Sequence, residues 1–282
     1  YNSAGVTGSD NLGVGVASLY NLTSGSWNVA TGDYGLFSAT TGSYNTSVGS
    51  EALKSNTTAN SNTAVGYQSL YNNTTGSPNQ AFGYRTLYAN TTGVENSGFG
   101  YQVLAANTTG GNNSGYGDGA LYTNTTGSYN TGLGAYSLYS NTTASYNTAV
   151  GYQAGYSNTI GEITAVGYQS LYTQGASAAG YTTAIGYQSG YTYNAASEGG
   201  GSIFIGNSTG TSKPASGNGV MLHITGSDGQ KTEILQDCFG TGTYNLFLGR
   251  AARGTVASPT AVQSGDVLVK FGGNGYSTSG YT

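Results

Sequence analysis

A pattern of hydrophobic and polar positions repeats every 17 residues through most of the chain. One unit, residues 62–78, reads Asn-Thr-Ala-Val-Gly-Tyr-Gln-Ser-Leu-Tyr-Asn-Asn-Thr-Thr-Gly-Ser-Pro. Its first glycine, here named the repeat glycine, recurs without an insertion at Gly15, Gly32, Gly49, Gly66, Gly83, Gly100, Gly117, Gly134 and Gly151. The spacing then changes to 16, 19 and 20 residues, at Gly167, Gly186 and Gly206. Internal repetition at a fixed period is the signature of a stacked repeat architecture.

Two positions of the unit are regularly apolar, and each forms a column, meaning the residues at one position of successive units. The residues before the repeat glycine are Val14, Thr31, Val48, Val65, Phe82, Phe99, Tyr116, Leu133 and Val150. The residues four after it are Leu19, Leu36, Leu53, Leu70, Leu87, Leu104, Leu121 and Leu138. We expect these two columns to supply the buried side chains of each unit, stacked along a continuous apolar seam.

The unit predicts two short strands and two turns. A period of 17 is too short for a helix-turn-helix repeat, which needs about 33 residues or more. Residues 62–66 and 67–71 are strand-sized runs, ended by the repeat glycine and by the Asn-Thr-Thr-Gly segment. Each strand is expected to pair in parallel with its equivalent in the next coil, about 4.8 Å away. The glycine is expected to adopt a positive φ or allow a close backbone approach, and the Asn and Thr columns to satisfy turn backbone groups.

These features predict an all-β protein whose residues 1–206 form a parallel β-solenoid. Residues 207–282 depart from the repeat, and strand-like runs at 220–225, 231–235, 244–248 and 267–271 predict a small antiparallel β module. About 75 residues make a marginal core, which favours a module that trimerises. A thin coil also leaves one apolar edge exposed, so we expect self-association with cyclic symmetry; the residues alone do not give the number of copies.

The repeat resembles a known family. Asn147-Thr-Ala-Val-Gly-Tyr-Gln-Ala154 and Thr183-Ala-Ile-Gly-Tyr-Gln-Ser189 are similar to head repeats of trimeric autotransporter adhesins, the YadA-like heads. That resemblance implies a left-handed β-roll in a homotrimer. The longer unit, with its Asn-Thr-Thr-Gly-Ser-Tyr-Asn spacer, resembles head-like repeats of bacteriophage tail fibres. The match covers residues 11–206, and residues 249–268 are similar to a tail-fibre segment that lies upstream of an endosialidase-type intramolecular chaperone.

The resemblance implies a structural component of a phage tail fibre, located in the virion. Such a component is a rigid trimeric shaft that presents or forms a host-receptor-binding surface. Its expected partners are two further copies of itself, other tail proteins and host surface polysaccharide. The alternative is a bacterial trimeric adhesin at the cell surface. Because the chain begins at Tyr1, we expect a fragment or a processed product, which leaves removal of a signal peptide open. For the chaperone, the resemblance leaves two alternatives: it has been cleaved off, or the chain stops before it.

Composition and charge narrow the function classes. Charged residues make up 6% of the chain, far below the roughly 25% of an ordinary soluble domain, and the net charge is −4. No run of Lys and Arg provides a nucleic-acid footprint, and no apolar stretch has the roughly 18 residues of a membrane span. His223 and Cys238 are each the only residue of their kind, so no zinc site, disulfide framework or cofactor is expected.

A catalytic role is not expected. Asp33 and Glu51 lie one coil apart, which is close enough for the carboxylate spacing of about 5–9.5 Å that glycosidases use. No other residue supports a site there, and we favour a surface charge on a turn. A polysaccharide depolymerase stays a lower alternative, as does an ice-binding solenoid that uses its threonines.

Aromatic columns are the candidate binding surface. Tyrosine offers a flat apolar face and a hydroxyl, which suit sugar rings. The candidate glycan-binding residues are Tyr67, Tyr84 and Tyr101 directly after the repeat glycine, and Trp27, Tyr44 and Tyr129 in a second stripe. The competing interpretation is a stacked ladder that stabilises the coils or a trimer seam. Six Asn-x-Thr sequons are interpreted as turn residues rather than glycan acceptors: Asn56, Asn73, Asn90, Asn107, Asn124 and Asn141.

Overall fold

The computed structural model describes residues 7–174, 181–193, 202–206, 221–225, 253–255 and 258–260. These residues form strands and turns, with no helix among them. The chain divides into two compact units, Tyr1–Thr232 and Glu233–Thr282. All of the repeat lies in the first unit.

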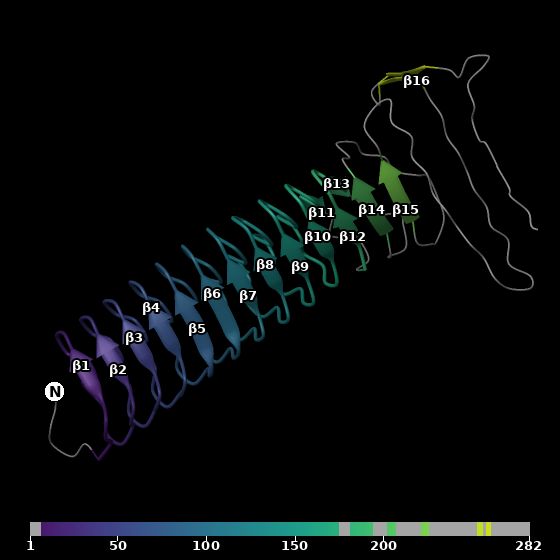
Figure 1. Ribbon diagram of the computed structural model, residues 1–282. Helices are drawn as coiled ribbons and strands as arrows, with labels where there is room; N and C mark the ends of the chain where they lie inside the picture. Colours follow the sequence, from purple (N-terminus) through teal and green to yellow (C-terminus); the bar gives the residue numbers. More distant parts are fainter. Residues whose placement is uncertain are drawn as a thin grey trace, which may run out of the picture. The chain divides into compact units, whose positions relative to one another are not determined.

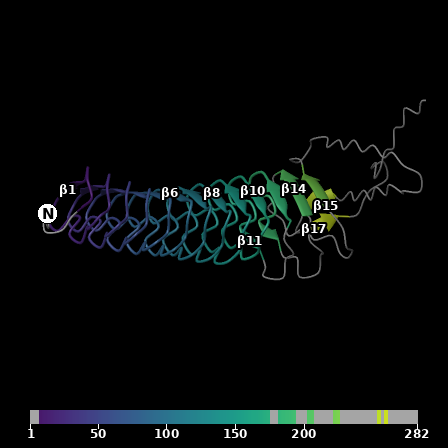
Figure 2. The same ribbon diagram turned by 90° about the horizontal axis from the view of Figure 1, so that it is seen from below.

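The first unit contains one parallel sheet of 13 strands (Figure 1). Its strands, in spatial and chain order, are β1 (Leu12–Val14), β2 (Val29–Thr31), β3 (Thr46–Val48), β4 (Thr63–Val65), β5 (Asn79–Phe82), β6 (Asn96–Phe99), β7 (Ser114–Tyr116), β8 (Thr131–Leu133), β9 (Thr148–Val150), β10 (Thr164–Val166), β12 (Thr183–Ile185), β14 (Ser202–Gly206) and β15 (Met221–Thr225). Each strand pairs with the equivalent strand one coil later, as Figure 2 shows from below. The predicted parallel β-solenoid of 17-residue coils is therefore confirmed.

Equivalent strand residues stay paired even where the spacing between repeat glycines is irregular. Val150 pairs with Val166, Val166 with Ile185, and Ile185 with Ile205, although 16, 19 and 20 residues separate the corresponding glycines. The extra residues are therefore absorbed outside the strands. After the turns that follow the repeat glycine, β11 (Thr173–Gln174) pairs in parallel with β13 (Thr192–Tyr193), its equivalent in the next coil.

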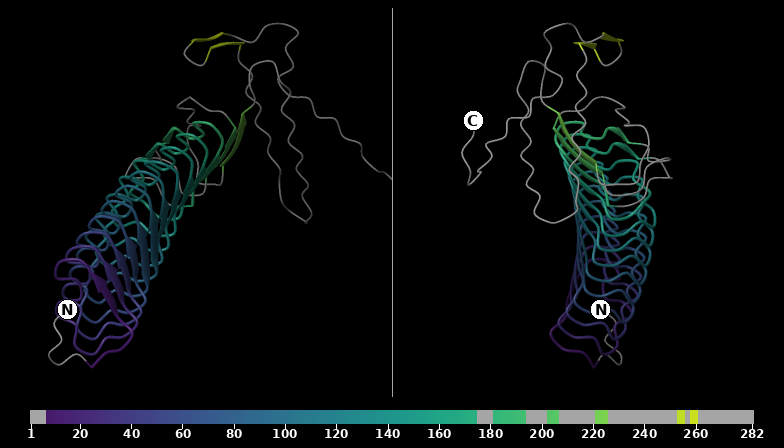
Figure 3. Two further views of the ribbon diagram at one scale, coloured as in Figure 1. Left: turned by 60° about the vertical axis from the view of Figure 1, so that its left-hand side comes forward. Right: turned by 90° about the vertical axis from the view of Figure 1, so that its right-hand side faces the viewer.

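Each regular coil holds one strand, so the predicted second strand is wrong. Residues 67–71 form turns rather than a strand. Figure 3 shows the strands along one side of the coils, with turns and loops completing each coil. Gln68 and Leu70 have φ values of 54° and 49°, which an extended strand does not allow. Their N–H groups still bond between coils, to Ser50 and Thr86 at 3.1 and 3.0 Å. The left-handed conformation costs about 1–2 kcal/mol per residue and is sustained here by the stacked neighbours.

The core is built from a different pair of columns than the sequence indicated. The leucine column is buried, as predicted: Leu36 to Leu138 have no exposed surface. The residue before the repeat glycine points outward instead, and Val14 is 55% exposed. The buried strand residue is the one two before the glycine, usually alanine, as in Ala64 and Ala81. Successive strand residues face opposite sides, and the thin coil leaves room inside only for the small one.

Large and small residues compensate across the core. The residue two before the glycine becomes Gly98 and Gly115 where bulkier Thr86 and Val103 lie opposite, and an added Cβ at either glycine would collide with them. The exchange reverses near the end of the regular sheet. There Gly190 stands in the leucine column and Phe204 in the inner strand column, with Phe204 ring carbon Cδ2 3.3 Å from where a Gly190 Cβ would lie. In these three places, a larger side chain occupies the space that the facing glycine leaves.

The repeat glycine combines a positive φ with a close backbone approach. Gly134 has φ 132°, and an added Cβ would lie 2.5 Å from the carbonyl oxygen of Gly151 in the next coil. The same contact joins Gly66 to Gly83 and Gly83 to Gly100. Both expectations for this glycine are therefore confirmed, and no other residue fits the position without strain.

Two buried asparagine columns form ladders along the solenoid. In one, Asn45 donates from Nδ2 to Asn28 Oδ1 at 3.1 Å and to Ala59 O at 2.9 Å. In the other, Asn107 donates to Asn90 Oδ1 at 2.8 Å and to Gly110 O at 3.0 Å. Threonine hydroxyls make a third ladder to carbonyls of the next coil, from Thr23, Thr40, Thr57, Thr74, Thr91, Thr108 and Thr125. The predicted Asn and Thr ladders are confirmed.

The region after residue 206 is described only in part. β15 falls on the predicted run 220–225 but pairs in parallel with β14, so the solenoid sheet continues past residue 206. In the second unit, β16 (Arg253–Thr255) pairs with β17 (Ser258–Thr260) in an antiparallel hairpin that was not predicted. The predicted strands at 231–235, 244–248 and 267–271 lie outside the described residues.

Replacing the repeat glycine is expected to be far costlier than replacing its neighbour. Gly134→Ala should lower the free energy of unfolding by at least about 2 kcal/mol, since backbone strain and overpacking each cost about 1–3 kcal/mol. Gly132→Ala in the same coil places its Cβ 2.9 Å from Ser137 Oγ, the end of a short side chain that can move, and not against backbone. Ala64 and Ser69 occupy the equivalent two positions in another coil, so this change should be much better tolerated. Urea unfolding followed by circular dichroism measures both; equal midpoints would contradict the assignment.

Removing one rung of an asparagine ladder is expected to destabilise the fold. Asn107→Ala leaves the Asn90 acceptor, the Gly110 carbonyl and the Asn124 donor without this buried partner. Each buried unsatisfied group costs about 1–3 kcal/mol. Asn72→Ala is the control, because its half-buried side chain makes no hydrogen bond within the described part, and it should change stability by less than about 0.5 kcal/mol. Thermal unfolding of both variants tests the difference.

Candidate functional site

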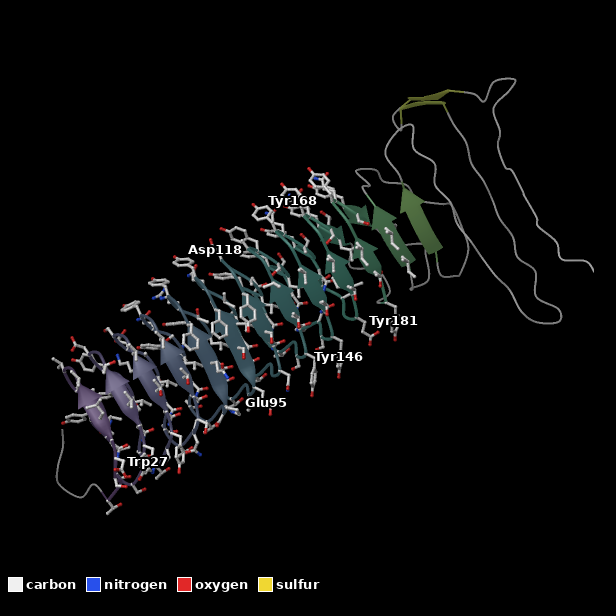
Figure 4. All side chains as sticks on the ribbon, in the orientation of Figure 1. Trp27, Glu95, Asp118, Tyr146, Tyr168 and Tyr181 are labelled. Atoms are coloured by element: carbon white, nitrogen blue, oxygen red, sulfur yellow. The ribbon has the colours of Figure 1, made fainter. Side chains whose placement is uncertain are left out.

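The candidate glycan-binding residues lie in two columns, one beyond the C-terminal ends of the strands and the other before their N-terminal ends. In Figure 4, Tyr168 marks the column that includes Tyr67, Tyr84 and Tyr101, beyond the C-terminal ends of the strands. Trp27 and Tyr146 mark the other column. The strands lie between, so the structure does not bring the two groups together into one site.

The first group is a stack of rings. Tyr67 and Tyr84 have centroids 5.7 Å apart, and Tyr84 and Tyr101 5.0 Å, with nearly parallel planes. Tyr84 is therefore covered on both faces by its neighbours. A sugar packs its C–H face on an open aromatic ring, and only the outer faces of Tyr67 and Tyr101 remain outside the stack. The contacts observed are those of the ladder interpretation, worth about 0.5–1.5 kcal/mol per pair.

The second group is more exposed. Trp27, Tyr44 and Tyr129 all have a positive φ of about 60°, and Tyr129 stacks on Tyr146 at 5.1 Å. Ser61 occupies the same position with the same backbone conformation. The strained backbone therefore belongs to the coil rather than to the aromatic side chains, and it is no sign of a binding site at these residues.

Polar side chains form a chain that crosses three coils. Lys54 Nζ donates to Glu51 Oε1 at 2.6 Å, Gln68 Nε2 to Glu51 Oε2 at 2.7 Å, and Arg85 Nε to Gln68 Oε1 at 2.7 Å. Hydrogen bonds from Lys54 and Gln68 lower the pKa of the Glu51 carboxyl, and the bond to Glu51 raises the pKa of Lys54. The sequence signal was available, because Glu51, Gln68 and Arg85 occupy one position of consecutive units.

The two carboxylates considered for glycoside hydrolysis are both engaged. Asp33 Oδ1 accepts a hydrogen bond from the Val16 N–H at 2.8 Å, and both oxygens of Glu51 accept from side chains. A glycosidase acid has a raised pKa, whereas that of Glu51 is lowered. The geometry of this pair is that of structural hydrogen bonds.

The remaining single residues add no site. The six sequon asparagines are buried, with ladder hydrogen bonds in place of exposed amides. His223 lies in β15 opposite Phe204, and Cys238 lies outside the described residues. No group of three metal-ligating side chains occurs in the part of the chain that the structure describes.

An outward apolar column is the surface that sequence reasoning misplaced into the core. Phe82, Phe99 and Tyr116 stack outward with centroids 4.7 and 4.9 Å apart and almost parallel planes. Beyond them, Leu133 is 47% exposed and Ile185 43% exposed. Contiguous apolar surface of this kind is typical of a protein–protein contact. We name this column, which begins at Val14 and ends at Ile205, the outer column.

Comparison with known proteins gives no relative. No model of a protein family matches the chain, and neither a curated protein nor a solved structure matches it. Across the described ranges, no helix has the length and apolar character needed to span a bilayer.

The stacked tyrosines should make stability sensitive to alkaline pH. Burial, with Tyr122 and Tyr156 adding to it, raises the pKa of Tyr139 above the usual 10 or so. The neutral phenol is therefore favoured in the folded state. Its contribution to stability is complete below about pH 10 and is lost as the pH rises through the folded-state pKa.

Tyr139→Phe keeps the stacked ring and removes the ionisable hydroxyl, so it should weaken the dependence of stability on alkaline pH. Thermal unfolding midpoints measured from about pH 8 to about pH 11 should fall less steeply for the variant than for the parent protein. Parallel curves for the two proteins would contradict the prediction.

Proposed function

We propose that this chain is a segment of a bacteriophage tail fibre, a rigid homotrimeric shaft that presents or forms a host-receptor-binding surface directed at surface glycans. The outer column is the observation that supports it most. A solenoid with an apolar stripe along its whole sheet face needs a partner of equal length, and a second and third copy provide one.

Stiffness is the property that a shaft requires, and the bonding pattern supplies it. Backbone hydrogen bonds join each coil to both neighbours, as when Leu70 N–H donates to Thr86 and Gln68 N–H donates to Ser50. The asparagine, threonine and tyrosine ladders run in the same direction. Bending the stack would break several of these contacts at once. No catalytic step is part of the proposal.

The resemblance of residues 147–154 to YadA-like head repeats supports a left-handed β-roll and a trimer. The same resemblance suits a bacterial surface adhesin. The segment at 249–268, which is similar to tail-fibre sequence upstream of a chaperone, favours the fibre.

The expected particle has three times the chain mass of 28.5 kDa. Leu133→Asp should dissociate it, because a charge on the outer column would be buried without a partner at the proposed seam, at a cost of several kcal/mol per copy. The single, dissociated chain should tolerate the change, because Leu133 is 47% exposed in it. Light scattering coupled to size-exclusion chromatography measures the mass.

Thr126→Asp is the matched control, placed on an exposed turn of the neighbouring coil. It should leave the trimer intact, and circular dichroism should show both variants folded. A monodisperse monomer of the parent protein would overturn the assembly, and dissociation by Thr126→Asp would remove the role of the outer column.

A further inference from the structure

The column of rings five residues after the repeat glycine is interrupted twice, at Lys54 and at Ala105. Lys54 Nζ lies over the Tyr71 ring, 5.3 Å from its centroid, so only the interruption at Ala105 has a small side chain. Tyr71 and Tyr88 stack at 5.2 Å, and Tyr122 and Tyr139 at 5.1 Å. Ala105 stands between Tyr88 and Tyr122. Two coil steps separate these tyrosines, about 10 Å at the spacing of paired strands. Each has a ring on one side only, and the separation matches one further ring between them.

A neighbouring column loses its side chain at almost the same place. Two residues after the repeat glycine, the column runs Glu51, Gln68, Arg85 and Gln102, and then reaches Gly119. A Cβ at Gly119 would lie 3.0 Å from the Tyr136 ring. The Tyr136 ring of the next coil therefore covers Gly119, and the small side chain that faces the interruption is Ala105.

Unused hydrogen-bond donors lie beside the interruption. Arg85 uses its Nε for Gln68, and its terminal N–H groups have no partner among the described residues. Its guanidinium carbon lies 4.9 Å from the centroid of Tyr88, one of the two bounding rings. The side-chain amide of Gln102, in the coil of Ala105, is also without a partner there. Contacts with Gln68 and Tyr88 hold the guanidinium in place, which suits it to bidentate binding of a carboxylate.

We propose that this interruption binds one pyranose ring that carries a carboxylate, as part of an acidic polysaccharide. The sugar ring lies between Tyr88 and Tyr122 in the position that Ala105 leaves open. The paired N–H groups of Arg85 bind the carboxylate, and the Gln102 amide bonds a ring hydroxyl. The Asp118 side chain lies two coils from Arg85 and accepts a hydrogen bond from Tyr136 at 3.1 Å. The carboxylate of the sugar therefore lies at the Arg85 side of the site, away from the like charge of Asp118.

The site rests on the proposed glycan-directed function and gives it a substrate class. It lies after the repeat glycine, on the side where Figure 4 labels Asp118, beyond the strand ends and off the outward sheet face. Assembly through the outer column therefore leaves it accessible.

The test is isothermal titration of the folded full chain with a galacturonic acid hexamer and, as the neutral probe, cellohexaose. The acidic hexamer should bind and the neutral one should bind at least about tenfold more weakly, because the neutral hexamer lacks the carboxylate for charge-assisted hydrogen bonds from Arg85. Arg85→Gln should weaken binding of the acidic hexamer by a similar factor while leaving the thermal midpoint nearly unchanged.

Ala105→Tyr completes the stack and should abolish binding of the acidic hexamer without loss of fold. Tyr156→Ala is the matched control: it opens an equivalent gap between Tyr139 and Tyr172, with no arginine beside it, and should not alter binding of the acidic hexamer. Undiminished binding by Ala105→Tyr, equal affinity for the two hexamers, or no binding of either would overturn the site. In each case a trimeric mass would leave the shaft proposal standing.

Discussion

Each coil of this protein folds against a near copy of itself, and the match between like residues in neighbouring coils is the constraint behind the rest of the structure. Hydrogen bonds along the stack join equivalent positions, so a residue suits the fold only if it suits the coil before and the coil after. This is why three ladders of different chemistry run in parallel. It also explains how Leu70 and its equivalents tolerate a left-handed backbone, since buried packing and a hydrogen bond on the next coil offset the strain.

The same constraint makes the coil thin and places large apolar residues outside it. Only alanine, glycine or serine fits the inner strand position in the regular coils, so Phe82 and Phe99 point outward and stack along the sheet. The inner strand position takes small side chains beside the buried leucine column, and the larger apolar side chains of the strand lie on the outer surface. A regular repeat also makes exceptions visible. Ala105 and Gly119 each occupy a column position where neighbouring coils carry a larger side chain.

Much of the fold could be predicted, but the candidate site could not. Sequence spacing gave the parallel stacking, the repeat glycine contacts and the asparagine ladders, because each depends only on equivalent residues lying one coil apart. It failed for residues 67–71, where alternating positive φ values at non-glycine residues leave no compositional trace. It also assigned Val14 and its column to the interior, because apolar character alone does not say which side of a three-residue strand faces in. The hydrogen-bonded chain through Gln68 and Arg85 follows the 17-residue spacing, but side-chain directions that spacing does not specify decide which of these groups meet.

The sequence by itself determined the period, the parallel pairing and which side chains stack on which, since a column is read directly from the spacing of residues. Only the tertiary structure decided which columns face the interior, which rings have an open face and which polar groups lack a partner. The physical reason is that stacking is a one-dimensional relation fixed by residue number. The path of the backbone around one coil depends instead on dihedral angles, and neighbouring coils select those angles by packing.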